Sequence, residues 1–181
     1  MDKQTLEGKC VAILATDGFE KSELEVPKKA LEDAGARVDV VSLQGGKIKS
    51  WDRKNWSDAI DVDVALSEAD SQDYDALVLP GGVMNPDALR VDKAALDFVK
   101  AFSASGKPIG AICHGPWTLI EDESFLLGKK MTSWPSLQTD LENAGAEWVD
   151  QEVVVDQGLV TSRKPDDLPA FNRCLIQAIH G

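Results

Sequence analysis

The chain is poor in histidine: among 181 residues it has only His114 and His180. A reaction that depends on an imidazole therefore has almost no choice of residue. The three cysteines are odd in number and widely spaced, so they do not make a framework of disulfides. Two distant histidines and scattered cysteines also lack the spacing of metal ligands. We expect neither a metal nor a cofactor.

Long apolar runs and an excess of positive charge are missing as well. No segment approaches the ~18 uninterrupted apolar residues of a membrane span, and residues 1–8 lack the apolar core of a signal peptide. The chain has 19 Lys and Arg against 31 Asp and Glu, which gives a formal net charge of −12. A nucleic-acid surface needs clustered basic residues. We therefore expect a cytoplasmic protein without membrane or nucleic-acid partners.

The pattern of apolar segments and turn signals predicts one α/β domain over residues 1–181, with residues 1–8 as a short extension. Continuous apolar runs are typical of central parallel strands that are covered on both faces. The predicted strands are 10–15, 37–42, 75–79 and a run that ends at Cys113. The predicted helices begin near residues 19, 92, 116 and 166, and Gly35 and Gly106 close the first two.

Two further segments complete the predicted fold. Residues 44–66 give weak signals, with a turn at Gly45-Gly46 and edge structure over 60–66. An antiparallel hairpin at a sheet edge is predicted near the end of the chain. Its strands are residues 148–149 with 153–155 and residues 159–162, and its turn is at 157–158. The predicted fold is a three-layer, flavodoxin-like α/β sandwich with a mostly parallel central sheet.

The most informative segment is 107–117, where a short apolar run ends in Cys113, His114, Gly115 and Pro116. This pattern predicts a buried strand, a tight turn and a helix that begins at the proline, which suits the first helical position. Cys113 would then lie at the positive end of a helix dipole, which favours thiolate over thiol. The next residue, His114, adds an imidazole as a possible base. The segment therefore has the pattern of a nucleophile elbow, with a cysteine as the nucleophile.

Other reactive groups follow neighbouring predicted strands. Ligands of open α/β sheets bind beyond the carboxyl ends of the strands. The first strand leads to Glu20 and Glu23, three residues apart on one helix face. The third strand leads to Gly81 and Gly82, whose amides are free of side-chain crowding. A cysteine thiolate, backbone amide donors and a carboxylic acid would then lie close together. This combination is typical of a site that attacks a carbonyl or acyl carbon.

These residues, in this order and spacing, resemble the ThiJ/PfpI superfamily over nearly the whole chain. That superfamily includes parkinsonism-associated deglycases, glyoxalase III-type enzymes and intracellular PfpI-type proteases. The landmarks are FEKSEL at 19–24, ALVLPGG at 76–82, AICHGP at 111–116 and TSR at 161–163. A cysteine, histidine and glycine alone would be weak evidence, whereas the ordered set is specific.

The resemblance implies a role for each matching residue. Cys113 is similar to the family nucleophile, and Glu23 is similar to a protonated glutamate that donates a hydrogen bond to the cysteine sulfur. Burial and a like charge would raise the pKa of such a carboxyl. Gly81, Gly82 and the amide of His114 match the positions of the family's oxyanion hole.

The resemblance also implies self-association, as a homodimer or a homohexamer. PfpI-type members complete a Cys-His-acid triad with a glutamate from a neighbouring subunit. The matching residue here is Asp87, which is one methylene shorter than glutamate and therefore reaches less far toward His114. The remaining candidates, as residues that line the pocket, are Glu20, Trp117, Trp134 and Arg163.

Several of these residues also have plain structural interpretations. Cys10, within a strand, and Cys174, on the last helix, are interpreted as small buried hydrophobic residues. His114 could be a turn residue without a catalytic role, and Asp87 could simply start a turn. Glu20 fits a favourable charge in the first turn of a helix.

Three functions stay open from the sequence. The leading hypothesis is a stress-protective enzyme of the glutathione-independent glyoxalase or protein deglycase type, which acts on small dicarbonyls or glycated proteins through Cys113. The second is a PfpI-type cysteine peptidase with Cys113, His114 and a partner's Asp87. The third is a redox-sensing stress protein or chaperone, because exposed cysteines of low pKa oxidise readily. A glutamine amidotransferase is excluded, since its late His-x-Glu pair is absent.

Overall fold

The computed structural model describes residues 5–181, so part of the predicted extension, residues 1–4, lies outside the described residues. The rest of the extension packs against the domain. Leu6 is fully buried, and its N–H donates to the Ala34 carbonyl at 2.7 Å. Among residues 5–181, no helix has both the length and the apolar character to cross a bilayer.

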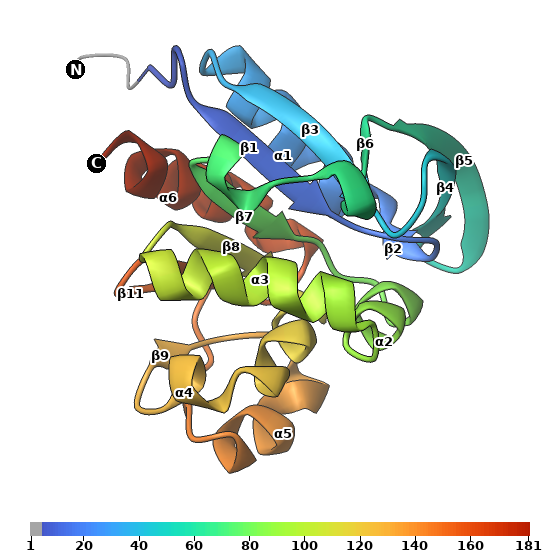
Figure 1. Ribbon diagram of the computed structural model, residues 1–181. Helices are drawn as coiled ribbons and strands as arrows, with labels where there is room; N and C mark the ends of the chain where they lie inside the picture. The colour runs from blue at the N-terminus through green and yellow to red at the C-terminus, as the bar shows by residue number, and fades with distance from the viewer. Residues whose placement is uncertain (1–4) are drawn as a thin grey trace.

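Seven strands form the central sheet of the molecule (Figure 1). Their order is β11-β12-β8-β7-β1-β3-β6, and all neighbours are parallel except β11 and β12. This arrangement confirms the predicted parallel sheet with an antiparallel edge pair. The strands are β1 (Cys10–Leu14), β3 (Arg37–Ser42), β6 (Val64–Ala65), β7 (Ala76–Leu79), β8 (Ile109–Ile112), β11 (Val153–Asp156) and β12 (Leu159–Ser162).

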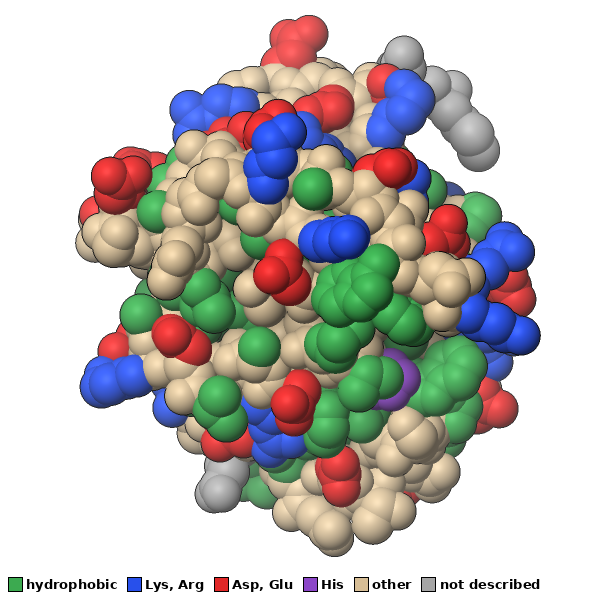
Figure 2. All heavy atoms as spheres, turned by 90° about the vertical axis from the view of Figure 1, so that its right-hand side faces the viewer, with side chains coloured by type: hydrophobic (Ala, Val, Ile, Leu, Met, Phe, Trp, Pro, Cys, Tyr) green, Lys and Arg blue, Asp and Glu red, His purple; other side chains and the backbone are tan. Residues whose placement is uncertain are grey.

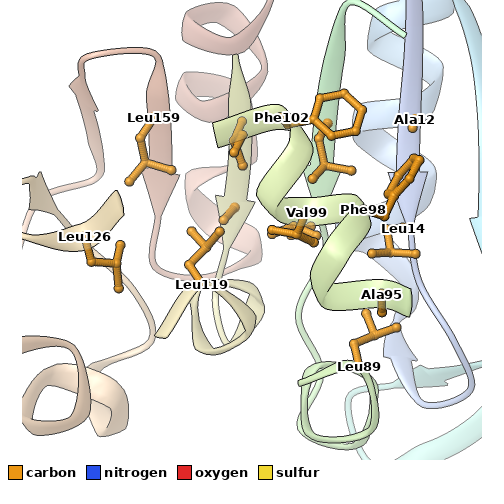
Figure 3. Packing of buried hydrophobic residues seen from close by; sticks show 14 of the residues in the cluster. Ala12, Leu14, Leu89, Ala95, Phe98, Val99, Phe102, Leu119, Leu126 and Leu159 are labelled. Atoms are coloured by element: carbon orange, nitrogen blue, oxygen red, sulfur yellow. The ribbon is translucent and has the colours of Figure 1, made fainter. Parts of the chain in front are cut away.

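Helices cover both faces of this sheet, because alternate residues of its strands point to opposite sides. Helix α3 (Lys93–Ser105) packs on one face, and α1 (Lys21–Asp33) and α6 (Leu168–His180) pack on the other. Figure 3 shows Phe98 and Phe102 of α3 directed toward the sheet. Both faces of the sheet are therefore buried, which is why its strands have continuous apolar sequences.

Shorter elements surround the core. They include a second, two-stranded sheet of β9 and β10, and several turns of 3₁₀ helix. These elements are α2 (Met84–Leu89), η3 (Gly115–Glu121), α4 (Glu123–Leu126), β9 (Lys130–Met131), η4 (Pro135–Leu137), α5 (Gln138–Asn143), β10 (Glu147–Trp148), η1 (Leu66–Glu68), η2 (Ser71–Asp73) and η5 (Pro165–Asp167).

A long hairpin stands at the right of Figure 1 and was not predicted by the sequence. It consists of β4 (Gly46–Asp52) and β5 (Asn55–Val62), and β2 (Phe19–Glu20) pairs with β4. Most of its side chains are exposed or half-buried, and only Ile48 and Ser50 are buried. The alternation of apolar and polar residues that marks a half-buried strand is therefore confined to short stretches such as Ile60-Asp61-Val62.

Two predicted helices differ in their start or type, and one predicted strand pairing was wrong. The first helix begins at Lys21 rather than near residue 19, because residues 19–20 pair with β4. The helix expected from Pro116 is the 3₁₀ helix η3. Residues 148–149 are not part of the edge hairpin, because Trp148 pairs with Met131 of β9.

Candidate active site

The candidate nucleophile Cys113 lies directly after β8, at the carboxyl edge of the sheet. Its backbone has a φ of 62°, in the left-handed region that side chains other than glycine rarely adopt. The Cys113 N–H donates to the Ser162 carbonyl at 3.0 Å, and its carbonyl accepts from the Trp134 N–H at 2.8 Å. Two neighbouring segments thus hold a strained residue in place, as is common at functional sites.

The turn after Cys113 is possible only with glycine at position 115. A Cβ on Gly115 would lie 2.2 Å from the carbonyl oxygen of Leu79, the last residue of β7. The turn must pass this close to β7 for Cys113 to reach the same edge as the loop that follows Leu79. Sequence and geometry therefore agree that this is a tight elbow.

Glu23 of α1 points its carboxyl group into the interior beside Cys113. Its side chain is fully buried, and burial raises its pKa to about 8. Oε2 accepts a hydrogen bond from the Gly81 N–H at 2.8 Å. Oε1 is buried and has no hydrogen-bond partner among the described residues. At neutral pH the carboxyl is therefore mostly protonated, with Oε1 free to carry the proton.

Cys113 itself is under opposing influences. Burial raises the pKa of its thiol, and a charged Glu23 would raise it further. The N–H groups of His114 and Gly82 favour the thiolate and lower the pKa in part, so that the net effect raises it. Below pH 8 Glu23 is neutral, so its repulsion is absent and its O–H is available as a donor. The helix dipole expected from the sequence is weak here, because η3 is a short 3₁₀ helix rather than an α-helix.

His114 is half-buried and lies beside the nucleophile. Its Nδ1 is 3.3 Å from the Cys113 sulfur, and its ring stacks on Trp134 with centroids 5.9 Å apart. Burial lowers the pKa of His114, so the ring is neutral at pH 7 and can accept a proton. In the part of the chain that the structure describes, no carboxylate hydrogen-bonds to this imidazole.

A pocket of about 450 Å³ opens above Cys113. Its walls come from the carboxyl edge of the sheet, from the turn of the β4–β5 hairpin and from the start of α2. Figure 2 shows a face of the molecule where apolar side chains gather around a histidine. The pocket is lined by Gly18, Glu20, Glu23, Trp51, Arg53, Gly82, Val83, Met84, Cys113, His114, Trp134 and Pro165.

The structure brings most of the predicted site residues together. Cys113, His114, Glu23 and Gly82 meet at the base of the pocket, and Glu20 and Trp134 line it. Burial raises the pKa of Glu20, whose Oε1 accepts from the Arg53 N–H at 3.4 Å.

Four predicted residues lie elsewhere or are engaged differently. The Gly81 N–H is bound to Glu23, so Gly82 and His114 are left as the amide donors near the sulfur. Trp117 packs edge-on to His114 and does not line the pocket. The Arg163 guanidinium is bound by Asp150 and Asp167 instead of facing the pocket. Asp87 is exposed on α2 and does not reach His114 within the chain.

Sequence reasoning missed the wall that the β4–β5 hairpin and α2 supply. Trp51 and Arg53 belong to the hairpin, and Val83 and Met84 start α2. Only the aromatic residue in the Trp51-Asp52-Arg53 turn could have drawn attention, and it carries no spacing signal. Asn85, which is fully buried behind the Gly81–Gly82 loop, was also missed.

Comparisons with known proteins agree with this geometry. The family model described as the DJ-1/PfpI family matches residues 9–178. The chain is 47% identical over 91% of its length to "Putative cysteine protease YraA" of Bacillus subtilis, covering 95% of that protein. It is 45% identical over 91% of its length to "Protein/nucleic acid deglycase 2" of Escherichia coli, covering 94%. The crystal structure of Drosophila melanogaster DJ-1beta superposes with a TM-score of 0.85 at 30% identity, covering 96% of this chain and 91% of that one.

Proposed function

Because this chain belongs to the DJ-1/PfpI family, we propose that it is a cysteine-dependent enzyme of the glutathione-independent glyoxalase or protein deglycase type. The observation that carries the proposal is the position of Cys113. Its sulfur lies at the base of a small pocket, 3.3 Å from the imidazole of His114 and beside the buried Glu23 carboxyl. Relatives named as deglycases support the same choice.

The first step is the attack of sulfur on an aldehyde such as that of methylglyoxal. The thiol proton passes from Cys113 to Nδ1 of neutral His114 as the S–C bond forms, and it is then delivered to the carbonyl oxygen. The product is a hemithioacetal. The N–H groups of Gly82 and His114 lie beside the sulfur and stabilise the negative charge that develops on the oxygen.

The second step moves a proton between adjacent carbons. His114 takes the proton from the carbon bound to sulfur and returns it to the neighbouring carbonyl carbon, while the hydroxyl proton of the hemithioacetal passes to the oxygen of that second carbon. The first carbon is thereby oxidised to a thioester carbonyl and the second is reduced to a carbinol. The result is a thioester of a 2-hydroxy acid. Water then cleaves the thioester and returns the Cys113 thiol, so methylglyoxal and water give lactate. Glu23, with a pKa of about 8, acts mainly as a proton donor at neutral pH.

Lactate production from methylglyoxal without glutathione tests this function. Wild type should turn over, and Cys113→Ala should not. Cys174→Ala is the matched control, because it removes a half-buried thiol on α6 that does not line the pocket. Turnover that survives in purified Cys113→Ala would end the proposal, as would inactivity of well-folded, reduced wild type.

A second candidate, a cysteine peptidase, is supported by the relative named as a putative cysteine protease. Among residues 5–181 of one chain no carboxylate hydrogen-bonds to His114, so we infer that a peptidase triad would take Asp87 from a second copy. Asp87 is exposed on α2, next to the exposed apolar side chains of Val83 and Met84. Peptide hydrolysis that depends on Cys113, is lost in Asp87→Ala and tracks the oligomer in gel filtration would favour this candidate.

A further inference from the structure

Asn85 is a buried polar residue whose hydrogen bonds all go to the backbone around the nucleophile. It lies in α2 and has no exposed surface. Its Oδ1 accepts from the Thr16 N–H at 2.8 Å, and its Nδ2 donates to the carbonyl oxygens of Pro80 at 3.0 Å and Gly81 at 3.1 Å. Both amide hydrogens and the oxygen are therefore used, and no described side chain shares them.

These contacts fix the orientation of one peptide group. The Gly81 carbonyl is held by Asn85 and also accepts from the Glu20 N–H at 3.3 Å. In a planar trans peptide the N–H of the next residue points opposite to the carbonyl. The Gly82 N–H thereby points away from Asn85, and Gly82 and Cys113 line the same pocket. The preceding peptide is fixed as well, because the Gly81 N–H donates to Glu23.

The backbone at this loop would otherwise be free to rotate. Glycine lacks the Cβ that restricts φ and ψ, and Gly82 has a φ of 78°. Position 82 must be glycine, because a Cβ there would lie 2.3 Å from the Gly18 carbonyl oxygen. Two adjacent glycines give close approach to the sulfur but no rigidity, so an external group has to supply the rigidity.

We propose that Asn85 is a positioning residue, which holds the Gly81–Gly82 peptide so that the Gly82 N–H faces Cys113 across the base of the pocket. Asn85 touches neither the pocket nor the nucleophile, and it acts only through the backbone. Without its Nδ2 donor the peptide can turn, and the sulfur loses one of its two amide donors. The proposal rests on the proposed function only in taking Cys113 as the reactive group.

The test is the pH profile of Cys113 alkylation by iodoacetamide, followed by peptide-resolved mass spectrometry so that Cys10 and Cys174 do not contribute. Asn85→Leu keeps the approximate shape of the side chain, adds no charge and removes every hydrogen bond. If the thiolate loses one amide hydrogen bond, the midpoint of the Asn85→Leu profile should rise by about one pH unit, because hydrogen bonds to charged groups contribute an amount of that order. Alkylation below the midpoint should then slow about tenfold. kcat should fall by a similar factor, with KM little changed.

Asp75→Ala is the matched control. Asp75 also holds the backbone, accepting from the Cys10 N–H at 2.8 Å, but it precedes β7, at the end of that strand opposite the pocket. This variant should keep the wild-type alkylation profile although it too loses stability. A folded Asn85→Leu with the wild-type profile would overturn the proposal. Because alkylation requires no turnover, this result is independent of whether the protein is a glyoxalase.

A measurement on the wild type covers the case in which Asn85→Leu does not fold. In a ¹⁵N-resolved NMR titration, the Gly82 amide proton should shift as Cys113 ionises, as expected for a direct N–H to sulfur hydrogen bond. The His114 amide provides the internal reference, since it also faces the sulfur. A Gly82 signal that stays unchanged while the His114 signal moves would contradict the proposed orientation.

Discussion

The buried Glu23 carboxyl makes the stability of the protein depend on pH, and this dependence can be isolated by substitution. Cys113 also titrates, so the comparison is made between Cys113→Ser and the double variant Cys113→Ser/Glu23→Gln. Serine has a similar shape and does not titrate between pH 4 and 9. Glutamine keeps an oxygen that can accept from the Gly81 N–H. The two proteins therefore differ only in whether position 23 can lose a proton.

The magnitude follows from the pKa of Glu23 in the two states. Burial raises the pKa from its ordinary value of 4.5 to about 8 in the folded protein. The folded state then binds more protons than the unfolded state between these pH values, so stability falls as pH rises. At about 1.4 kcal/mol for each pH unit, the loss over the whole window is roughly 5 kcal/mol. The stabilisation that comes from the proton on Glu23 is fully present below pH 4.5 and is lost above pH 8.

Urea denaturation at intervals between pH 4.5 and 8.5 gives the free energy of unfolding of both variants. The stability of Cys113→Ser should fall relative to that of the double variant across this range. A constant difference would refute the reasoning, because Glu23 would then ionise in the folded protein as readily as in the unfolded chain. Comparing wild type with Cys113→Ser then counts the protons of the Cys113–Glu23 pair. If the resting Cys113 is a thiol, both proteins lose stability with the same slope. If it is a thiolate beside protonated Glu23, the folded and unfolded wild type bind equal numbers of protons, and the fall is offset.

Three further changes have defined outcomes. Gly115→Ala puts a Cβ 2.2 Å from the Leu79 carbonyl oxygen, so the free energy of unfolding measured by urea denaturation should fall by roughly 2 kcal/mol or more. An unchanged denaturation midpoint would contradict the tight turn at this position. His114→Gln removes the proposed base, so kcat for methylglyoxal should drop about 10²-fold or more while circular dichroism is unchanged; undiminished kcat would assign the base elsewhere. Asp167→Ala removes the bidentate partner of Arg163, so the Tm should fall by an amount equivalent to about 2 kcal/mol while activity is retained. A loss of activity would indicate that Arg163 belongs to the active site after all.

The sequence could predict the sheet and the tight turn at Cys113 because both leave strong local signals. Fully buried parallel strands need continuous apolar runs, and the turn after Cys113 needs glycine because Leu79 approaches so closely. The β4–β5 hairpin leaves only a short alternation at Ile60-Asp61-Val62, since most of its side chains face solvent. The pocket wall formed by Trp51 and Arg53 was therefore out of reach from the sequence.

The engagement of Gly81 shows a second limit of the sequence. A Pro-Gly-Gly loop indicates unobstructed amides, but not which acceptor each amide faces. In the structure the Gly81 N–H donates to Glu23, and the Gly82 N–H lies on the side of Cys113. Asn85 fixes the orientation of this peptide. In the sequence, Asn85 belongs to an Asn-Pro-Asp segment that is typical of a simple turn. The direction of one peptide group depends on a tertiary contact, so it has no sequence pattern. The chemistry of Cys113 therefore depends on a residue that its motif does not contain.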